Sequence, residues 1–134
     1  MTQTAIRQSL ADCQTIAVVG LSPKPHRDSF RVAKYMQDHG FRIVPINPNA
    51  PEVLGERAYA SLSEAAEHVQ IDMVNCFRNA EDIPPIAAEA IAIGAKSLWL
   101  QLGVVNDAAA AKATAAGLHV VQNRCLMVEH RQLK

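Results

Sequence analysis

Residues 16–29 read IAVVGLSPKPHRDS: an apolar run, typical of a buried strand, ends at Gly20 and leads through a polar, proline-rich loop into an amphipathic segment. In α/β domains, a loop between a strand and a helix N-terminus presents backbone N–H groups to phosphate. Ser22 and Pro25 replace the second and third glycines of the G-x-G-x-x-G dinucleotide motif. The loop therefore predicts a nucleotide-binding domain that differs from an ordinary NAD fold. Three residues of the loop suit an anionic ligand: Lys24, His26 and Arg27.

Five short apolar runs alternate with helical patterns along the chain. They span Thr15–Val19, Arg42–Ile46, Met73–Cys76, Ser97–Leu100 and His119–Val121. Strands that alternate with helices imply right-handed crossovers and a parallel sheet covered on both faces. We therefore predict the α/β class, with one Rossmann-like domain over residues 1–134 and its core at about 15–130. Its sheet is expected to have five parallel strands, with helices on both faces.

The helical segments carry capping signals. They are expected over residues 4–12, 29–39, 61–68, 82–93 and 107–116. Ser61 and Glu64 form the S-x-x-E pattern of a capping box, and Asn106 can cap the last of these helices. Residues 84 and 85 are prolines, which fit only a first helical turn. Residues 47–54 are expected to form an ordered loop, and the segment around residues 129–130 a solvated tail.

The bulk composition excludes several classes of protein. Thirteen basic and thirteen acidic residues cancel, and aromatic residues make up only 4% of the chain, so no overall field or basic-aromatic stripe favours nucleic acid or an anionic membrane. Neither a membrane-spanning run nor a signal peptide is recognisable. Cys13, Cys76 and Cys125 are widely spaced without a C-x-x-C pair, which predicts free thiols in a reducing cytoplasm.

Familiar catalytic and metal-binding patterns are missing from the sequence. The five histidines lack the spacing of zinc ligands, and neither a G-x-S-x-G elbow nor a G-x-x-x-x-G-K-[ST] loop occurs. We therefore expect no metal site and assign no catalytic residue.

The segments that follow the five predicted strands are chemically distinctive. Ligands of open parallel sheets bind outside the carboxyl ends of the strands, so these exits outline a candidate site. Turns are rich in glycine, asparagine and proline in any case, which is the structural alternative for each single exit. The exits read Gly20-Leu21-Ser22, Asn47-Pro48, Phe77-Arg78, Gln101-Leu102-Gly103 and Asn123-Arg124-Cys125.

A series of spaced motifs gives the chain a family resemblance from about residue 15 to 130. In order they are VVGLS, P-x-R-x-S, PINP, LGERAYASL, D-x-V-x-x-FR, AIAIGAKSLWLQLGV, GL-x-VV-x-NRC and EH. The pattern resembles the small bacterial CoA-binding proteins of the YccU-like type, relatives of the CoA-binding domain of succinyl-CoA synthetase α-subunits. The resemblance implies a Rossmann-like fold that holds coenzyme A at the strand carboxyl ends. In the synthetases a second domain, which this chain lacks, supplies an active-site histidine, and this argues against enzymatic activity.

The resemblance also implies roles for individual residues. Gly20 would let the backbone approach the ligand, with Ser22 nearby, while Arg27 and Ser29 would meet a phosphate at a helix N-terminus. Residues 47–48 would form the wall near the adenosine, and residues 77–78 a stacking face with a phosphate-gripping guanidinium. Residues 101 and 103 would line the pantetheine arm. The full set of implied cofactor-binding residues is Gly20, Leu21, Ser22, Arg27, Ser29, Asn47, Pro48, Phe77, Arg78, Gln101, Gly103, Asn123 and Cys125.

Structural roles compete with some of these assignments. Arg78 can pair with Glu81 or Asp82 on the surface, and Phe77 can be core packing. A cysteine beyond the last strand can lie near the CoA thiol and form a mixed disulfide, or be an inert buried thiol, which leaves Cys125 open.

Several functions remain open from the sequence. The first is a non-catalytic protein that binds CoA or acyl-CoA, as a monomer or weak homodimer with a possible protein partner. The alternatives are an NADP-binding, oxidoreductase-like protein, a ligase-type subunit that needs a second chain, or a regulatory protein with a degenerate site. NAD-binding domains usually carry an acid at the end of their second strand, where this chain reads PINPN. NADP is less excluded, because Arg42 or Arg57 could serve its phosphate.

Overall fold

The computed structural model describes residues 2–133 and has a parallel sheet of five strands at its centre. The strand order is β2-β1-β5-β6-β7, and the neighbouring pairs are all parallel. The predicted class and the bounds of all five strands are confirmed. These strands are β1 (Thr15–Val19), β2 (Arg42–Ile46), β5 (Met73–Cys76), β6 (Ser97–Leu100) and β7 (His119–Val121).

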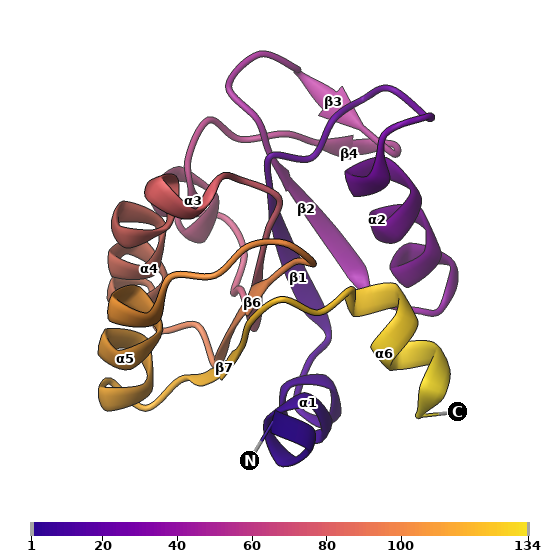
Figure 1. Ribbon diagram of the computed structural model, residues 1–134. Helices are drawn as coiled ribbons and strands as arrows, with labels where there is room; N and C mark the ends of the chain where they lie inside the picture. Colours follow the sequence, from indigo (N-terminus) through magenta and orange to yellow (C-terminus); the bar gives the residue numbers. More distant parts are fainter. Residues whose placement is uncertain (1, 134) are drawn as a thin grey trace.

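Helices cover both faces of the sheet (Figure 1). One layer holds α1 (Thr2–Ala11), α2 (Asp28–Asp38) and α6 (Leu126–Gln132), and the other holds α3 (Leu62–Ala66), α4 (Ile83–Ala92) and α5 (Asp107–Ala115). Side chains alternate along a strand, so Ile16 and Val18 pack toward the first layer while Ala17 and Val19 pack toward the second. Two buried clusters result, one on each side of the sheet.

The predicted capping signals are confirmed at two helices. The Ser61 hydroxyl accepts a hydrogen bond from the Glu64 N–H (3.1 Å), and the Asn106 side chain accepts one from the Ala109 N–H (3.0 Å). The two prolines lie in the first turn of α4, which follows the short 3₁₀ helix η1 (Ala80–Asp82). The bounds of the predicted helices differ from the observed ones by a few residues at most, as expected where helix ends fray.

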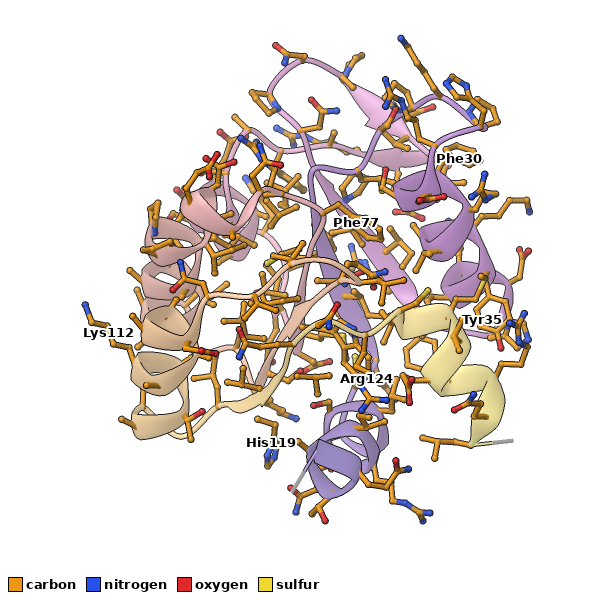
Figure 2. All side chains as sticks on the ribbon, viewed as in Figure 1. Phe30, Tyr35, Phe77, Lys112, His119 and Arg124 are labelled. Carbon is orange, nitrogen blue, oxygen red and sulfur yellow. The ribbon has the colours of Figure 1, made fainter. Side chains whose placement is uncertain are left out.

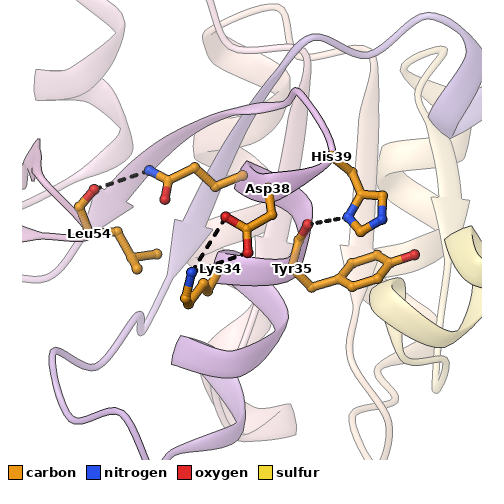
Figure 3. A network of polar contacts seen from close by, with 6 residues as sticks. Lys34, Tyr35, Asp38, His39 and Leu54 are labelled. Atoms are coloured by element: carbon orange, nitrogen blue, oxygen red, sulfur yellow. Dashed lines mark hydrogen bonds and ion pairs between the residues drawn. The ribbon is translucent and has the colours of Figure 1, made fainter.

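A short hairpin stands over the carboxyl end of the sheet. Its strands, β3 (Glu52–Val53) and β4 (Glu56–Arg57), are antiparallel, and β3 lies in the segment that was expected to be a loop. The Gln37 side chain on α2 donates to the carbonyl of Leu54 (3.0 Å), beside the Lys34–Asp38 ion pair (Figure 3). The hairpin is therefore fastened to the first helical layer.

The prediction of a solvated tail is wrong. The C-terminal segment forms α6, in which Leu126 is fully buried and the Glu129 carboxylate lies 3.7 Å from the Arg124 guanidinium. The helix packs beside α2, because the Leu126 side chain enters the core of that layer. Within residues 2–133, no helix combines the length and apolar character needed to cross a membrane.

Candidate functional site

The exits of β1 and β5 meet at the centre of the carboxyl edge, where the strand order reverses. β1 and β5 are neighbours, but β1 continues through α2 to the outer strand β2, whereas β5 continues through α4 to β6 on the other side. Gly20 follows β1 with a φ of +86°, and Phe77 follows β5 with its N–H bonded to the Val19 carbonyl (2.9 Å). In sheets of this order, ligands bind at such a switch point.

A first hollow of about 620 Å³ opens beside this point. It lies between the loop after β1, the start of α2 and Phe77. Five of the predicted site residues line it, together with both other basic residues of the loop and an aspartate. The lining residues are Gly20, Ser22, Lys24, His26, Arg27, Asp28, Ser29 and Phe77.

Hydrogen bonds within the loop hold the first hollow in shape. The buried Ser29 hydroxyl accepts from the Ser22 N–H (3.0 Å), and the Ser22 hydroxyl accepts from the Lys24 N–H (3.1 Å). Arg27 is the N-cap of α2 and has extended backbone angles. The N–H groups of a first helical turn have no partner within their own helix. The start of α2 therefore offers backbone donors, and the positive end of the helix dipole, to an anion.

The charges around the first hollow are predominantly positive. The Lys24 and Arg27 side chains are exposed at its rim. The Asp28 carboxylate, which would repel an anion, pairs with the Arg31 guanidinium, and that guanidinium also donates to the His26 carbonyl (3.0 Å). The negative charge of Asp28 is therefore balanced by Arg31, which does not itself line the first hollow.

A second hollow of about 300 Å³ continues past Phe77. It shares Asp28 and Phe77 with the first, so the two are neighbours along the same edge. Figure 2 shows Phe77 near the middle of the molecule, between the two helical layers. The predicted residues Gln101 and Cys125 belong to this second hollow. Its lining residues are Asp28, Arg31, Val32, Phe77, Gln101, Leu102, Cys125, Met127 and Val128.

A third hollow of about 360 Å³ lies across the sheet from the first, among residues of β1, β2, α3 and α4. It contains the predicted residues Pro48 and Arg78. Arg78 pairs with Asp82 (3.3 Å), as its structural alternative predicted, and half of its side chain is exposed. Its Cδ would lie 3.1 Å from a Cβ placed on Gly20, so the stem of Arg78 passes directly beside the exit of β1.

The remaining predicted residues brace the loops and line none of these three hollows. Leu21 is fully buried, and its carbonyl accepts from the Asn47 side-chain amide (2.9 Å). The Gly103 N–H donates to the Asn123 side-chain oxygen (2.7 Å), which ties the exits of β6 and β7 together. These residues hold the loops at the carboxyl edge in place without lining a hollow themselves.

The sequence-based prediction assigns no role to six residues of the first and second hollows. Asp28, Arg31 and Val32 lie on the first turns of α2, and the helical period starting at the loop could have found them. The other three are Leu102, Met127 and Val128; the last two were missed because α6 itself was not predicted.

The cysteines differ in their surroundings. Burial raises the pKa of the Cys76 thiol to about 12. Burial, and then the negative charge of Asp72, raises that of Cys13 to about 12. Both are therefore unreactive thiols. Cys125 is only half-buried and lies in the second hollow. Across the described chain, histidine, cysteine and acidic side chains form no group of three or more that could hold a metal ion.

Comparison with known proteins gives a consistent result. The CoA binding domain family matches residues 14–131. The chain is 40% identical over 129 residues to the uncharacterized protein YneT of Bacillus subtilis, covering 96% of this chain and 94% of that protein. A solved hypothetical protein from Pyrococcus horikoshii is 40% identical, with a TM-score of 0.92 over 99% of this chain and 92% of that one.

A larger enzyme shares part of the sequence. The ADP-forming acetate–CoA ligase II of Archaeoglobus fulgidus is 28% identical over 85 residues, which covers 62% of this chain but only 12% of the ligase. The small relatives are thus similar over nearly their whole length, and the ligase over one region.

Proposed function

Because the chain belongs to the CoA binding domain family, we propose that it binds coenzyme A or an acyl-CoA at the carboxyl edge of its sheet, without a reaction of its own. The observation that carries this proposal is the first hollow, where a braced loop, the start of α2 and the cations Lys24 and Arg27 surround the exit of β1. A local anion site of this kind suits a chain that has no net charge.

The first hollow would receive the pyrophosphate of CoA. Backbone donors at the start of α2 and the Arg27 guanidinium would bind its oxygens, while Ser29 keeps the loop in place through Ser22. Gly20 lets the chain turn at the edge of the first hollow with a φ of +86° and in close contact with the Phe77 backbone.

The two neighbouring hollows would take the ends of CoA. The adenosine would extend toward Pro48 in the third hollow, and the pantetheine arm past Phe77 toward Gln101 in the second. Arg78 lies between the first and third hollows. Its exposed pair with Asp82 contributes at most about 1 kcal/mol, so the guanidinium can exchange this carboxylate for a phosphate at little cost.

The NADP alternative is less well supported by the arrangement of arginines. Arg42 begins β2 and therefore lies at the amino end of the sheet, opposite the hollows. Arg57 stands on the hairpin with its guanidinium 4.9 Å from the centre of the Tyr59 ring. A ligase role would need a further chain, and the shared region with the acetate–CoA ligase supports CoA binding equally well without one.

The proposal is tested by the thermal stability of the protein with CoA, NADP or NAD added. A ligand that binds only the folded state stabilises it by about 2.7 kcal/mol at a hundredfold excess over Kd. We expect CoA to raise the melting temperature and both dinucleotides to leave it unchanged. A rise with NADP and none with CoA would reverse the assignment.

Free, well-separated cysteines fit a protein that works in a reducing cytoplasm.

A further inference from the structure

The second hollow has a lining that phosphate binding does not require. Four of its residues, from α2, the loop after β6 and α6, are aliphatic or thioether side chains: Val32, Leu102, Met127 and Val128. Leu102 is 70% exposed, the highest exposed fraction among the exposed large apolar residues of the described chain. Together with the other three side chains, Leu102 makes an apolar surface in the hollow against which an apolar group of a ligand can pack.

An amide donor without a protein partner lies among this lining. Gln101 is only 6% exposed, and its Oε1 accepts from both the Leu126 N–H (3.0 Å) and the Asn75 side-chain amide (3.2 Å). The backbone N–H of Leu126 can only donate, so the orientation of the Gln101 amide is fixed. Its Nε2 has no hydrogen-bond partner among the residues described, and Gln101 lines the second hollow. The Nε2 is not one of the fully buried polar atoms without a partner, so it is accessible in the hollow and can donate to an acceptor on a ligand.

We propose that the second hollow binds the acyl end of an acyl-CoA. The Gln101 Nε2 donates to the thioester carbonyl oxygen, and the apolar side chains enclose a short acyl chain. This inference rests on the proposed function, because a CoA moiety in the first hollow brings its thiol end past the shared residue Phe77. The hollow, at about 300 Å³, has room for the end of the arm and a chain of a few carbons.

The charges of the hollow favour a neutral acyl group. The carboxylate of Asp28 stands at the wall that the two hollows share, and the Arg31 guanidinium is already held by Asp28 and the His26 carbonyl. Among residues 2–133, no other cation lines the hollow. A terminal carboxylate on the acyl chain would therefore enter an apolar space without a free partner.

Calorimetric titration with CoA, acetyl-CoA, butyryl-CoA and succinyl-CoA tests the proposal. Full burial of one methylene raises affinity by up to about fourfold, so butyryl-CoA is expected to bind about tenfold more tightly than acetyl-CoA. Succinyl-CoA, with the same number of acyl carbons, is expected to bind more weakly than butyryl-CoA. Equal affinities for all four ligands would overturn the acyl site while leaving CoA binding intact. Failure of CoA itself to bind would overturn the proposed function as well.

Two variants and one matched control locate the effect. Leu102→Ser should reduce the ratio of butyryl-CoA to CoA affinity about fivefold or more, because its exposed side chain covers the acyl chain. Val105→Ser is the matched control: Val105 is also exposed, at 44%, but does not line the hollow, and the ratio should stay unchanged. Equal ratios in both variants would contradict the proposal.

Gln101→Glu removes the donor and should lower acetyl-CoA affinity more than CoA affinity, with circular dichroism as the check on folding.

Discussion

The backbone of Gly20 passes so close to Phe77 that a Cβ on the glycine would lie 2.7 Å from the Phe77 carbonyl oxygen. This contact joins the exits of the two central strands, β1 and β5. The positive φ of Gly20 and the close approach both exclude a side chain there. The glycine is therefore required by the protein's own backbone, in addition to any ligand that lies above it.

We expect Gly20→Ala to destabilise the protein strongly. The left-handed backbone costs a side chain about 1–3 kcal/mol, and the overlap with Phe77 adds about as much again. Gly40→Ala is the control, because Gly40 also has a positive φ, of +95°, but a Cβ there meets open space. Urea unfolding should show Gly20→Ala to be about 2 kcal/mol less stable than Gly40→Ala. Equal losses of stability in the two variants would mean that the backbone at the exits of β1 and β5 can move apart to accept a side chain at position 20.

Arg27→Ala is expected to weaken CoA binding about tenfold at low salt, since it removes a charge-assisted bond to phosphate at the start of α2. Screening should shrink the difference as ionic strength rises. Arg131→Ala removes another exposed charge, from a residue of α6 that lines none of the hollows, and should change affinity little. Titration calorimetry at two salt concentrations separates the cases, and equal effects of the two variants would remove Arg27 from the site.

Arg78 and Asp82 give a paired prediction. Arg78→Ala should weaken CoA binding, while Asp82→Asn should preserve or strengthen it, because the guanidinium is then free for a phosphate. Neither change should alter the free energy of unfolding by more than about 1 kcal/mol, since the ion pair is exposed. Unchanged affinity in Arg78→Ala would show that the arginine is only a surface ion pair.

Buried thiols predict a loss of stability at alkaline pH. The Cys76 thiol has a pKa near 12 in the folded protein and 9.0 when unfolded, so its contribution to stability is complete below pH 9 and is lost as pH rises toward 12. Between pH 8 and 10 this thiol alone should lower the free energy of unfolding by about 1 kcal/mol. Cys76→Ala should be less stable than the parent at pH 7 but lose less stability over this interval, as measured by urea unfolding. Identical pH profiles would exclude ionisation of Cys76 as the cause.

Much of the fold was predictable because local signals determine it. Short apolar runs that alternate with helical patterns predicted all five strands, and Ser61 and Asn106 marked the helix starts that they cap. Helix α6 was not predicted, because only seven residues form it and its stability comes from packing of Leu126 rather than from a local pattern.

The site was predicted as one surface, whereas the structure divides it among three hollows. Phe77 and Arg78 are consecutive, and alternation of side chains continues past the end of β5, so they line hollows on opposite faces of the sheet. Because side chains alternate between the two faces of a strand, the sequence alone could have predicted that these two residues lie on opposite faces. The free amide of Gln101 could not be predicted, because its orientation depends on Asn75 and Leu126, which are 26 and 25 residues away.

The most direct test of the central claim is a crystal structure of the protein grown with CoA. We predict density for the pyrophosphate in the first hollow, at the start of α2 beside Arg27, with the pantetheine arm passing Phe77 toward Gln101. CoA bound at the amino edge of the sheet, near Asp72 and Lys96, or no CoA at saturating concentration, would contradict the account.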